Sequence, residues 1–335
     1  MKKGIKFLSI LILSILILSV AGSAEEKSWP TQISIGAGTQ GAAAYMACSA
    51  WAKIFNEEFA GKVYFTVEVT AASVHNLRLI QSDQVELGLS APNAAWEAYN
   101  GKGFVEEEGD KPYDKIRGMI PGYGGIWQIY TLAKSNINNI RYFEGKSFSG
   151  LSADSLSNLT AKRIFGLFNI NVNILNMSMG DSIRALQDGL VVGGLCGWPN
   201  PSLSQLDVTN PVKVVVLDEE QSKKFKAAYP QYVWGLTMPK ETYRLQDADI
   251  STLSYYNNLY CSKDLPEDMV YEMIKRYYKK ENEKIVESIW PQMVEGSKPE
   301  NIIIFMNTPL HPGAVRYYKE QGIEIPENLM PPELK

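Results

Sequence analysis

Small polar side chains gather in short turns of this sequence, and the chemistry they offer is hydrogen bonding. The candidates carry hydroxyl, amide or aromatic groups, and in chain order they are Thr39, Gln40, Ser73, Asn76, Asn93, Tyr123, Ser155, Ser157, Trp198 and Asn200. Neutral groups of this kind bind polar atoms of a small molecule without transferring charge. Ser and Asn are also ordinary helix caps and turn formers, so each position by itself has that structural explanation.

Residue types that metal sites or covalent catalysis need are scarce in this chain. Its two histidines, His75 and His311, stand beside residues that make poor metal ligands, and we expect His311 to form a structural hydrogen bond at a helix entry. Cys48, Cys196 and Cys261 form no Cys-x-x-Cys pair; one disulfide is allowed, but we favour three buried thiols. We therefore predict no catalytic residue, no metal and no cofactor.

The candidate side chains stand between strands and helices. Periodicity predicts strands at 31–35, 63–70, 85–90, 147–151, 191–196, 212–217 and 250–262, and helices at 42–59, 77–81, 94–99, 159–168, 181–187 and 268–289. Two more apolar, strand-like segments span 116–120 and 127–133. Strands that alternate with helices in this way indicate an α/β fold with largely parallel sheets. The pattern restarts after residue 136, which divides the chain into two similar halves.

The polar turns gain meaning as a set, because most of them follow a strand and precede a helix. In open α/β sheets, ligands bind beyond the carboxyl ends of the strands, where helix N-terminal N–H groups attract anions and carbonyl oxygens. Such turns in two facing halves predict a cleft for a small polar ligand. Trp198 stands between Gly197 and Pro199 at the end of a predicted strand, and we expect it to cover an apolar part of that ligand.

The first 24 residues have the three parts of a secretory signal peptide. Three lysines precede an apolar segment at 7–21, and small residues follow at 22–24. About 15 apolar residues fall short of the ~20 that span a bilayer, so we predict cleavage after Ala24 in preference to an uncleaved anchor. The remaining chain has 30 basic and 37 acidic residues, which disfavours binding to nucleic acid. We expect a monomer in the periplasm or another extracytoplasmic space.

Several segments also match a family pattern. They are Gly36-x-Gly-Thr-x-Gly41, Val67-Glu-Val-Thr-x-x-Ser-Val-x-Asn-Leu-x-Leu79, Asp83-x-x-Glu-Leu-Gly-Leu89, Tyr99-x-Gly101, Leu132-Ala-Lys134 and Pro309-Leu-His-Pro-Gly-Ala-Val-Arg-Tyr-Tyr318. Through them the chain resembles, over nearly all of its mature length, the TAXI-type solute-binding proteins of TRAP (tripartite ATP-independent periplasmic) transporters. The C-terminal segment and the Ser-x-x-Asn-Leu block are the most specific of these markers.

The resemblance implies a two-lobed type II periplasmic-binding fold, in which each lobe is a mostly parallel sheet flanked by helices. It implies that residues 28–127 and 263–335 form lobe 1, that residues 135–253 form lobe 2, and that hinge crossings lie at 128–134 and 254–262. The lobes are expected to close on an organic acid or amino acid, and the loaded protein to dock on an ion-coupled TRAP membrane permease. The family's ligand positions correspond to Thr39, Ser73, Asn76, Ser155 and Ser157.

Two departures from the family pattern bear on the ligand. The turn of the second half reads Asp154-Ser-Leu-Ser157 where similar proteins carry Gly-Ser-Gly-Thr, and Ala91-Pro-Asn93 replaces a common Gln-x-Asp. Together with Trp198, these changes favour a less charged, larger or partly aromatic ligand over glutamate.

Other functions stay open at this point. The chain is equally compatible with an ATP-driven importer or a periplasmic sensor. An exported oxidoreductase that binds a dinucleotide at Gly36–Gly41 is a weaker alternative, because the residues after the second predicted strand, Val69–Ala72, offer no acid to hold a ribose.

Overall fold

The computed structural model describes residues 28–335, so the predicted signal peptide at 1–24 lies outside the described residues. The strands are β1 Gln32–Gly36, β2 Tyr64–Glu68, β3 Leu87–Ser90, β4 Ile116–Leu132, β5 Ser147–Leu151, β6 Asn173–Asn176, β7 Gly193–Trp198, β8 Val212–Val215, β9 Val233–Met238 and β10 Ile250–Ser262. The α-helices are α1 Ala43–Glu58, α2 Ser73–Gln81, α3 Pro92–Asn100, α4 Phe104–Glu108, α5 Leu156–Leu167, α6 Met179–Gln187, α7 Pro201–Thr209, α8 Glu219–Ala228, α9 Glu267–Tyr277, α10 Lys280–Ile289, α11 Gln292–Gly296, α12 Asn301–Phe305 and α13 Pro312–Glu320. No helix among residues 28–335 has the length and apolar character needed to cross a membrane.

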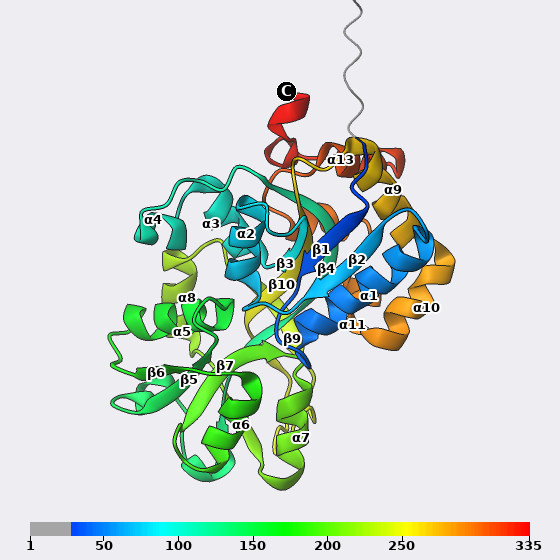
Figure 1. The fold of residues 1–335 in the computed structure, drawn as a ribbon. Helices are drawn as coiled ribbons and strands as arrows, with labels where there is room; N and C mark the ends of the chain where they lie inside the picture. Colours follow the sequence, from blue (N-terminus) through cyan, green and yellow to red (C-terminus); the bar gives the residue numbers. More distant parts are fainter. Residues whose placement is uncertain (1–27) are drawn as a thin grey trace, which may run out of the picture.

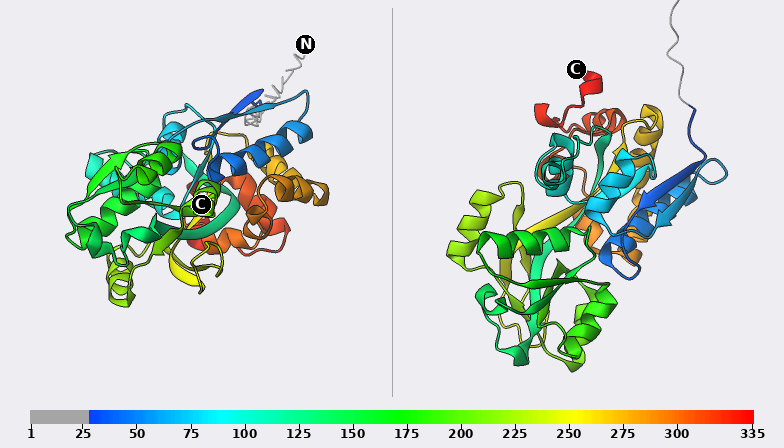
Figure 2. Two further views of the ribbon diagram at one scale, coloured as in Figure 1. Left: turned by 90° about the horizontal axis from the view of Figure 1, so that it is seen from below. Right: turned by 60° about the vertical axis from the view of Figure 1, so that its left-hand side comes forward.

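One mixed sheet runs through both halves of the described chain, in the order β2-β1-β3-β10-β4-β7-β5-β6, with β8 paired to β4 and β9 paired to β10. The strands β1 to β3 are parallel, as are β5 to β7, whereas β4 and β10 are antiparallel to their neighbours. Lobe 1 carries β1–β3, α1–α4 and α9–α13, and lobe 2 carries β5–β8 and α5–α8 (Figure 1). The right-hand view in Figure 2 shows the same two bodies, which confirms the expected two-lobed α/β fold.

Strand β4 crosses from lobe 1 to lobe 2, and it joins into one strand the two apolar segments that the sequence predicted separately. Glycines between those segments hid its continuity. A Cβ on Gly122 would lie 2.4 Å from the carbonyl oxygen of Asn257 in β10, and a Cβ on Gly125 would lie 1.7 Å from that of Trp198 in β7. Only glycine permits so close an approach of neighbouring strands.

The lobe limits and hinge crossings implied by the sequence stay predictions. In the structure, residues 128–132 of β4 pair with β7 and β8 of lobe 2. Strand β10 pairs with β9 over Ile250–Ser254 and with β3 of lobe 1 over 258–261, with a register shift between Asn257 and Asn258 against β4. The chain therefore passes between the lobes near 121–125 in β4 and near 255–257 in β10.

Apolar side chains form two buried clusters, of which the larger extends from lobe 1 into lobe 2 around α5 and the smaller includes the α6 and α7 side of lobe 2. Helix α1 packs on β2 and α10, and its buried face includes Trp51, Ile54 and Phe55, spaced three or four residues apart as an amphipathic helix requires. The core of lobe 2 includes Leu186 of α6 and Leu203 of α7. Burying one such side chain stabilises the fold by about 1.5–3 kcal/mol. The three cysteines are buried and free, as favoured from the sequence.

Some expectations about local structure are wrong. The helix predicted at 268–289 is two helices, because α9 ends at Tyr277 and the side-chain amide of Asn282 donates to the Arg276 carbonyl oxygen at 2.8 Å. Ser73 does not cap α2; it is the first helical residue, and Ala72 occupies the cap position. The short elements β6, β9, α7 and α8 were not predicted, because their apolar residues are too few to show a clear period.

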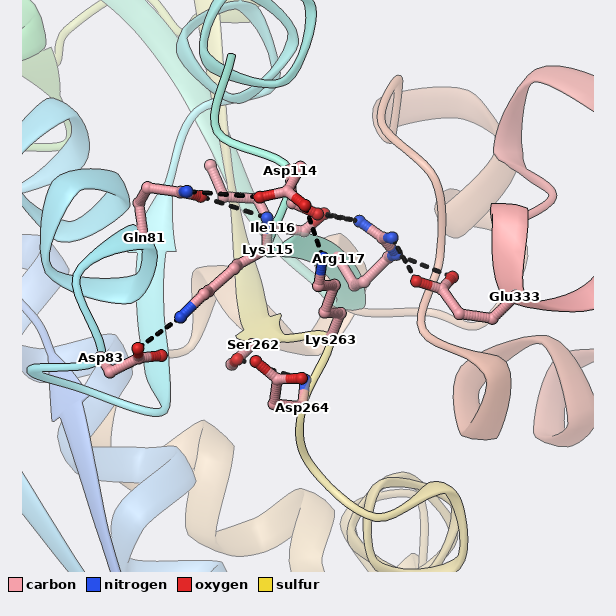
Figure 3. A network of polar contacts seen from close by, with 10 residues as sticks. All are labelled: Gln81, Asp83, Asp114, Lys115, Ile116, Arg117, Ser262, Lys263, Asp264 and Glu333. Atoms are coloured by element: carbon pink, nitrogen blue, oxygen red, sulfur yellow. Dashed lines mark hydrogen bonds and ion pairs between the residues drawn. The ribbon is translucent and has the colours of Figure 1, made fainter. Parts of the chain in front are cut away.

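The C-terminal segment contacts the start of β4 through Glu333 (Figure 3), at the end of lobe 1 remote from lobe 2 (Figure 1). Arg117, 2% exposed, donates from Nε to the Glu333 carboxylate at 3.2 Å and from Nη1 to the carbonyl oxygens of Asp114 and Ile116, both at 2.8 Å. We call Arg117 and Glu333 the intralobe ion pair, since both residues belong to lobe 1.

His311 lies near this ion pair and has the structural role expected of it. Its Nδ1 accepts the N–H of Gly313 at 3.2 Å and caps α13, while Nε2 lies 3.1 Å from the carbonyl oxygen of Leu265. Burial lowers the pKa of His311 from 6.5 to about 4. The imidazole is therefore neutral at pH 7, with its proton on Nε2.

Candidate functional site

A cavity of about 150 Å³ lies between the two lobes, and both lobes and the crossing strands line it. Six of the ten residues proposed from the sequence are among its lining, namely Thr39, Ser73, Tyr123, Ser155, Ser157 and Asn200. A cavity therefore lies between the halves, where the sequence predicted a cleft, and the binding role of these residues stays a prediction.

Five helices present their N-terminal ends to this cleft. The lining includes Ala43 and Ser73, which begin or lie in the first turn of α1 and α2, Leu156 of α5, Met179 of α6, and Ser202 of α7. The first backbone N–H groups of a helix have no partner within the helix and carry a partial positive charge. The cleft therefore favours ligand oxygens, above all those of an anion.

The side chains of the cleft supply no charge of their own. None of the described residues that line it is aspartate, glutamate, lysine, arginine or histidine. Cys196 lies in the wall, but burial raises the pKa of its thiol far above the ordinary value. The thiol stays protonated and is a poor nucleophile.

Ser155 and Asn200 are helix caps as well as cleft residues. Ser155 Oγ accepts the N–H of Asn158 at 3.2 Å and donates to the carbonyl oxygen of Ser152 at 2.7 Å. Asn200 Oδ1 accepts the N–H of Leu203 at 3.1 Å. The proton that Ser155 was expected to give to a ligand is thus already engaged. Of the six proposed residues in the described lining, Thr39, Ser73 and Ser157 have hydroxyls that make no side-chain hydrogen bond, so these three are available as donors.

Asn76 does not line the cleft but holds the elements beneath it. Its Nδ2 donates to the carbonyl oxygens of Ala37 and Leu89, at 2.9 and 2.8 Å, and its Oδ1 accepts the hydroxyl of Thr70 at 2.6 Å. All of its hydrogen-bonding groups are used, and it ties α2 to the ends of β1 and β3. A Cβ on Gly36 would lie 2.7 Å from Asn76 Oδ1, which explains the glycine there.

Three further residues proposed from the sequence also lie outside the lining of the cleft. Gln40 is exposed, Asn93 is 3% exposed within lobe 1, and Trp198 packs beside the core of lobe 2. For Trp198, the carbonyl oxygen accepts the hydroxyl of Tyr255 at 2.9 Å. Gln40 and Asn93 follow a strand and Trp198 ends one, but none of the three lines the cavity.

The aromatic floor of the cleft is formed by Trp127, for which the sequence left cleft floor and core packing equally open, and by Tyr255, which the sequence argument did not select. Their ring centroids lie 5.0 Å apart, and Tyr123 meets Tyr255 edge to face at 6.2 Å. Trp127 is 8% exposed, and its Nε1–H has no partner among the described residues. A signal was available, because Tyr123 and Trp127 are four residues apart in one strand and so face the same side.

Comparison with known proteins now decides the family. A model of the NMT1-like family matches residues 35–322. The chain belongs to the NMT1-like family. Solved structures also match this NMT1-like protein at low sequence identity. An L-cystine ABC transporter protein from Listeria monocytogenes aligns with a TM-score of 0.51 and 15% identity, over 80% of this chain and 99% of that one.

Two other structures agree with this fold. An ancestral arginine-binding protein bound to arginine aligns with a TM-score of 0.51 and 11% identity, over 78% of this chain and all of that one. A periplasmic transporter aligns with a TM-score of 0.50 and 10% identity, over 78% of this chain and 88% of that one. The type II periplasmic-binding fold expected from the sequence is therefore confirmed.

Proposed function

We propose that this protein is the extracytoplasmic solute-binding subunit of a membrane transporter and captures a small polar ligand between its lobes. The observation that carries the proposal is the interlobe cleft with five helix N-termini and no charged lining residue. An ion or molecule with acceptor oxygens is held there by neutral donors and released without breaking a salt bridge.

The ligand class we propose is an organic acid or amino acid with an apolar part. Helix N-termini favour its carboxylate, and the hydroxyls of Thr39, Ser73 and Ser157 donate further hydrogen bonds. Ser155 supports this set indirectly by fixing the first turn of α5. The role of covering the apolar part of the ligand, which the sequence assigned to Trp198, we propose for Trp127. Its ring covers that part, and its free Nε1–H donates to an acceptor of the ligand.

The membrane partner has two candidates. The L-cystine ABC transporter protein among the structural neighbours favours an ATP-driven importer, and we place this partner first. The segment Pro309–Tyr318 is similar to TAXI proteins and supports a TRAP permease as the second candidate. Uptake of the ligand by cells separates the two: ATP depletion at constant membrane potential stops an ATP-driven importer, whereas collapse of the ion gradient stops a TRAP transporter.

An exported oxidoreductase is a weaker candidate after the structure than before it. Strand β2 ends at Glu68, two residues earlier than predicted, so an acid does stand at its end. Glu68 Oε1 is 3.4 Å from the hydroxyl of Ser34, and Glu68 is not part of the cleft lining. A dinucleotide site also needs an acid that faces the ribose, and none of the described residues that line the cleft is acidic.

The proposal is tested with the solute that the exported protein retains on purification, identified by mass spectrometry and titrated back by calorimetry. Trp127→Ala should weaken its binding by about 2–3 kcal/mol, and Trp127→Phe by about 1 kcal/mol, because the phenyl ring keeps the apolar cover but has no donor. Trp198→Phe is the matched control outside the cleft lining. Unchanged binding by both Trp127 variants contradicts the assigned site.

The charge of the ligand is tested at Ser157. Ser157→Asp places a carboxylate at the start of α5 in the cleft, and Ser157→Asn places a neutral group of the same shape there. An acidic ligand should lose about 100-fold in affinity with the aspartate variant and only several-fold with the asparagine variant, because like charges repel strongly in a site with little water. Equal losses would show that the ligand carries no negative charge.

A further inference from the structure

Beside the cleft, a buried ion pair joins the two lobes. Arg163 of α5, in lobe 2, donates from Nη1 to Glu97 Oε1 at 2.7 Å and from Nη2 to Glu97 Oε2 at 2.8 Å. Glu97 belongs to α3 in lobe 1, and the exposed fractions of the two side chains are 5% for Arg163 and 0% for Glu97. We call Glu97 and Arg163 the interlobe ion pair. Figure 1 shows α5 and α8 directly below α3 and α4, where this contact forms.

Two aromatic rings of lobe 2 also contact Arg163, whose Nε has no partner among the described residues. Its guanidinium lies over the ring of Tyr229 at 5.1 Å and over that of Tyr232 at 5.9 Å, and Nη1 donates to the Tyr232 hydroxyl at 3.3 Å. Burial opposes the charge, yet the Glu97 carboxylate raises the pKa of Arg163 above its ordinary value. Lobe 2 thus presents a fixed guanidinium toward lobe 1.

Glu97 receives most of its hydrogen bonds from lobe 2. Besides Arg163, the side-chain amide of Gln231 donates to Glu97 Oε1 at 2.6 Å. Lobe 1 contributes the N–H of Phe104, 3.3 Å from Glu97 Oε2. Separation of the lobes would therefore take from Glu97 three of its four donors, and water would have to replace them.

The interlobe ion pair lies outside the ligand site, but the same structural elements carry both. Ser157 in the first turn of α5 lines the cleft, and Arg163 follows six residues later on the same helix. On the other side, Leu89 of β3 lines the cleft, and α3, which carries Glu97, begins directly after that strand. Neither Glu97 nor Arg163 is in the cleft lining.

We propose that Glu97 and Arg163 are positioning residues that hold the lobes closed and thereby set the ligand affinity without contacting the ligand. A bidentate, water-excluded pair favours the closed arrangement, and α5 then keeps its N-terminal N–H groups over lobe 1. The apparent affinity for a ligand scales with the fraction of protein that is closed. This inference rests on the proposed binding function only for its effect on affinity, because the closed arrangement is measured without ligand.

The test uses the ligand-free exported chain with two spin labels. Glu107→Cys on α4 and Ala227→Cys on α8 place one label on each lobe at exposed positions, and the three native cysteines are buried. In Glu97→Gln, which keeps the shape of the side chain but removes its charge, the distance distribution between the labels should broaden and shift to longer values. Glu333→Gln is the matched control, because it removes a glutamate from a buried arginine within one lobe, and its distribution should equal that of the wild type.

The affinity of the variants for the solute, and whether the variants fold, complete the test. Glu97→Gln should bind the retained solute about tenfold more weakly, with most of the change in the dissociation rate. Arg163→Lys keeps the charge but loses the bidentate geometry, so its affinity for the solute should lie between those of wild type and Glu97→Gln. It also serves as a second variant in case Glu97→Gln does not fold. An unchanged label distance in folded Glu97→Gln overturns the inference. A longer distance in a protein that binds no solute would uphold it and count against the proposed function.

Discussion

Arg117 and Arg163 are both almost fully buried, and each forms a paired contact with one glutamate, but the two contacts connect different things. The intralobe ion pair joins the start of β4 to the C-terminal segment of the same lobe. The interlobe ion pair joins α3 of lobe 1 to α5 of lobe 2. Both contacts pair a buried arginine with a glutamate carboxylate. They differ in how the structure responds when the pair is broken.

A buried arginine that loses its carboxylate must find water or other acceptors, and the route to them differs between the two sites. Arg117 keeps two backbone carbonyl oxygens as acceptors, and because both it and Glu333 belong to lobe 1, parting of the lobes does not uncover it. Arg163 reaches water when the lobes part. We therefore expect damage to the first pair to appear in the free energy of unfolding, and damage to the second to appear in the closure equilibrium.

The largest expected effect is the loss of folding stability at low pH through protonation of His311, which lies near the intralobe ion pair. Its pKa is about 4 in the fold against 6.5 as the ordinary value, so the unfolded chain binds the extra proton first. The stabilisation is complete above pH 6.5 and is lost as pH falls toward 4, by up to about 3 kcal/mol. Urea unfolding of wild type and His311→Asn between pH 7 and 4 measures this. Asparagine can cap α13 without titrating, so parallel curves for the two proteins would contradict the prediction.

The next effect is that of Glu333→Gln. It should lower the free energy of unfolding at pH 7 by about 1–3 kcal/mol, because a charged Arg117 stays buried with a neutral partner. Partial burial raises the pKa of Glu333, but the hydrogen bond from Arg117 outweighs it and the pKa is lowered from 4.5. The contribution is thus present above pH 4.5 and is lost as pH falls through the lower, folded pKa. The difference from wild type should shrink below pH 4; a constant difference would assign the loss to packing.

Glu97→Gln should change thermal stability less than Glu333→Gln does, although Glu97 is the more deeply buried glutamate. Opening of the lobes hydrates Arg163, and this limits the cost to the free energy of opening. We expect a decrease in the free energy of unfolding of about 1 kcal/mol or less, measured by calorimetry beside the label distances. A larger loss than in Glu333→Gln would mean that the lobes do not separate as units.

The smallest effect is expected for the exposed contact between the lobes. Arg78 of α2 lies 2.9 Å from Asp154, which is 48% exposed, and Arg78 also pairs with Glu108 of its own lobe. An exposed pair with an alternative partner contributes little, so Asp154→Asn should change the closure equilibrium by about 0.5 kcal/mol or less. A shift in label distance as large as that of Glu97→Gln would show that burial is not what distinguishes the interlobe ion pair.

The sequence predicted most elements and the position of the cleft, because both depend on local patterns. Strand β5 and strand β10 were predicted with the bounds that the structure gives them, and α1 begins one residue later than expected. Apolar alternation and helical period mark such elements whatever surrounds them. Strand β4 was predicted only in part, because its glycines allow close approach of neighbouring strands and the local sequence pattern contains no information about those strands.

Within the site, the sequence identified the turns but not the direction of each side chain. Thr39, Ser73 and Ser157 line the cleft with free hydroxyls, whereas Asn76 points beneath it and Trp198 away from it. All of these positions lie at or near a junction between a strand and a helix, so their local signals are alike. Only the neighbouring elements decide which side chain meets the cavity.

The sequence by itself determined an α/β chain in two halves and a set of uncharged donors near the ends of strands. These follow from residue period and composition, which are properties of short segments. The tertiary structure alone decided between cleft floor and core packing for Trp127, and it alone brought Glu97 to Arg163, 66 residues further along the chain. Contacts between distant segments depend on how the two lobes pack, and no local pattern records that arrangement.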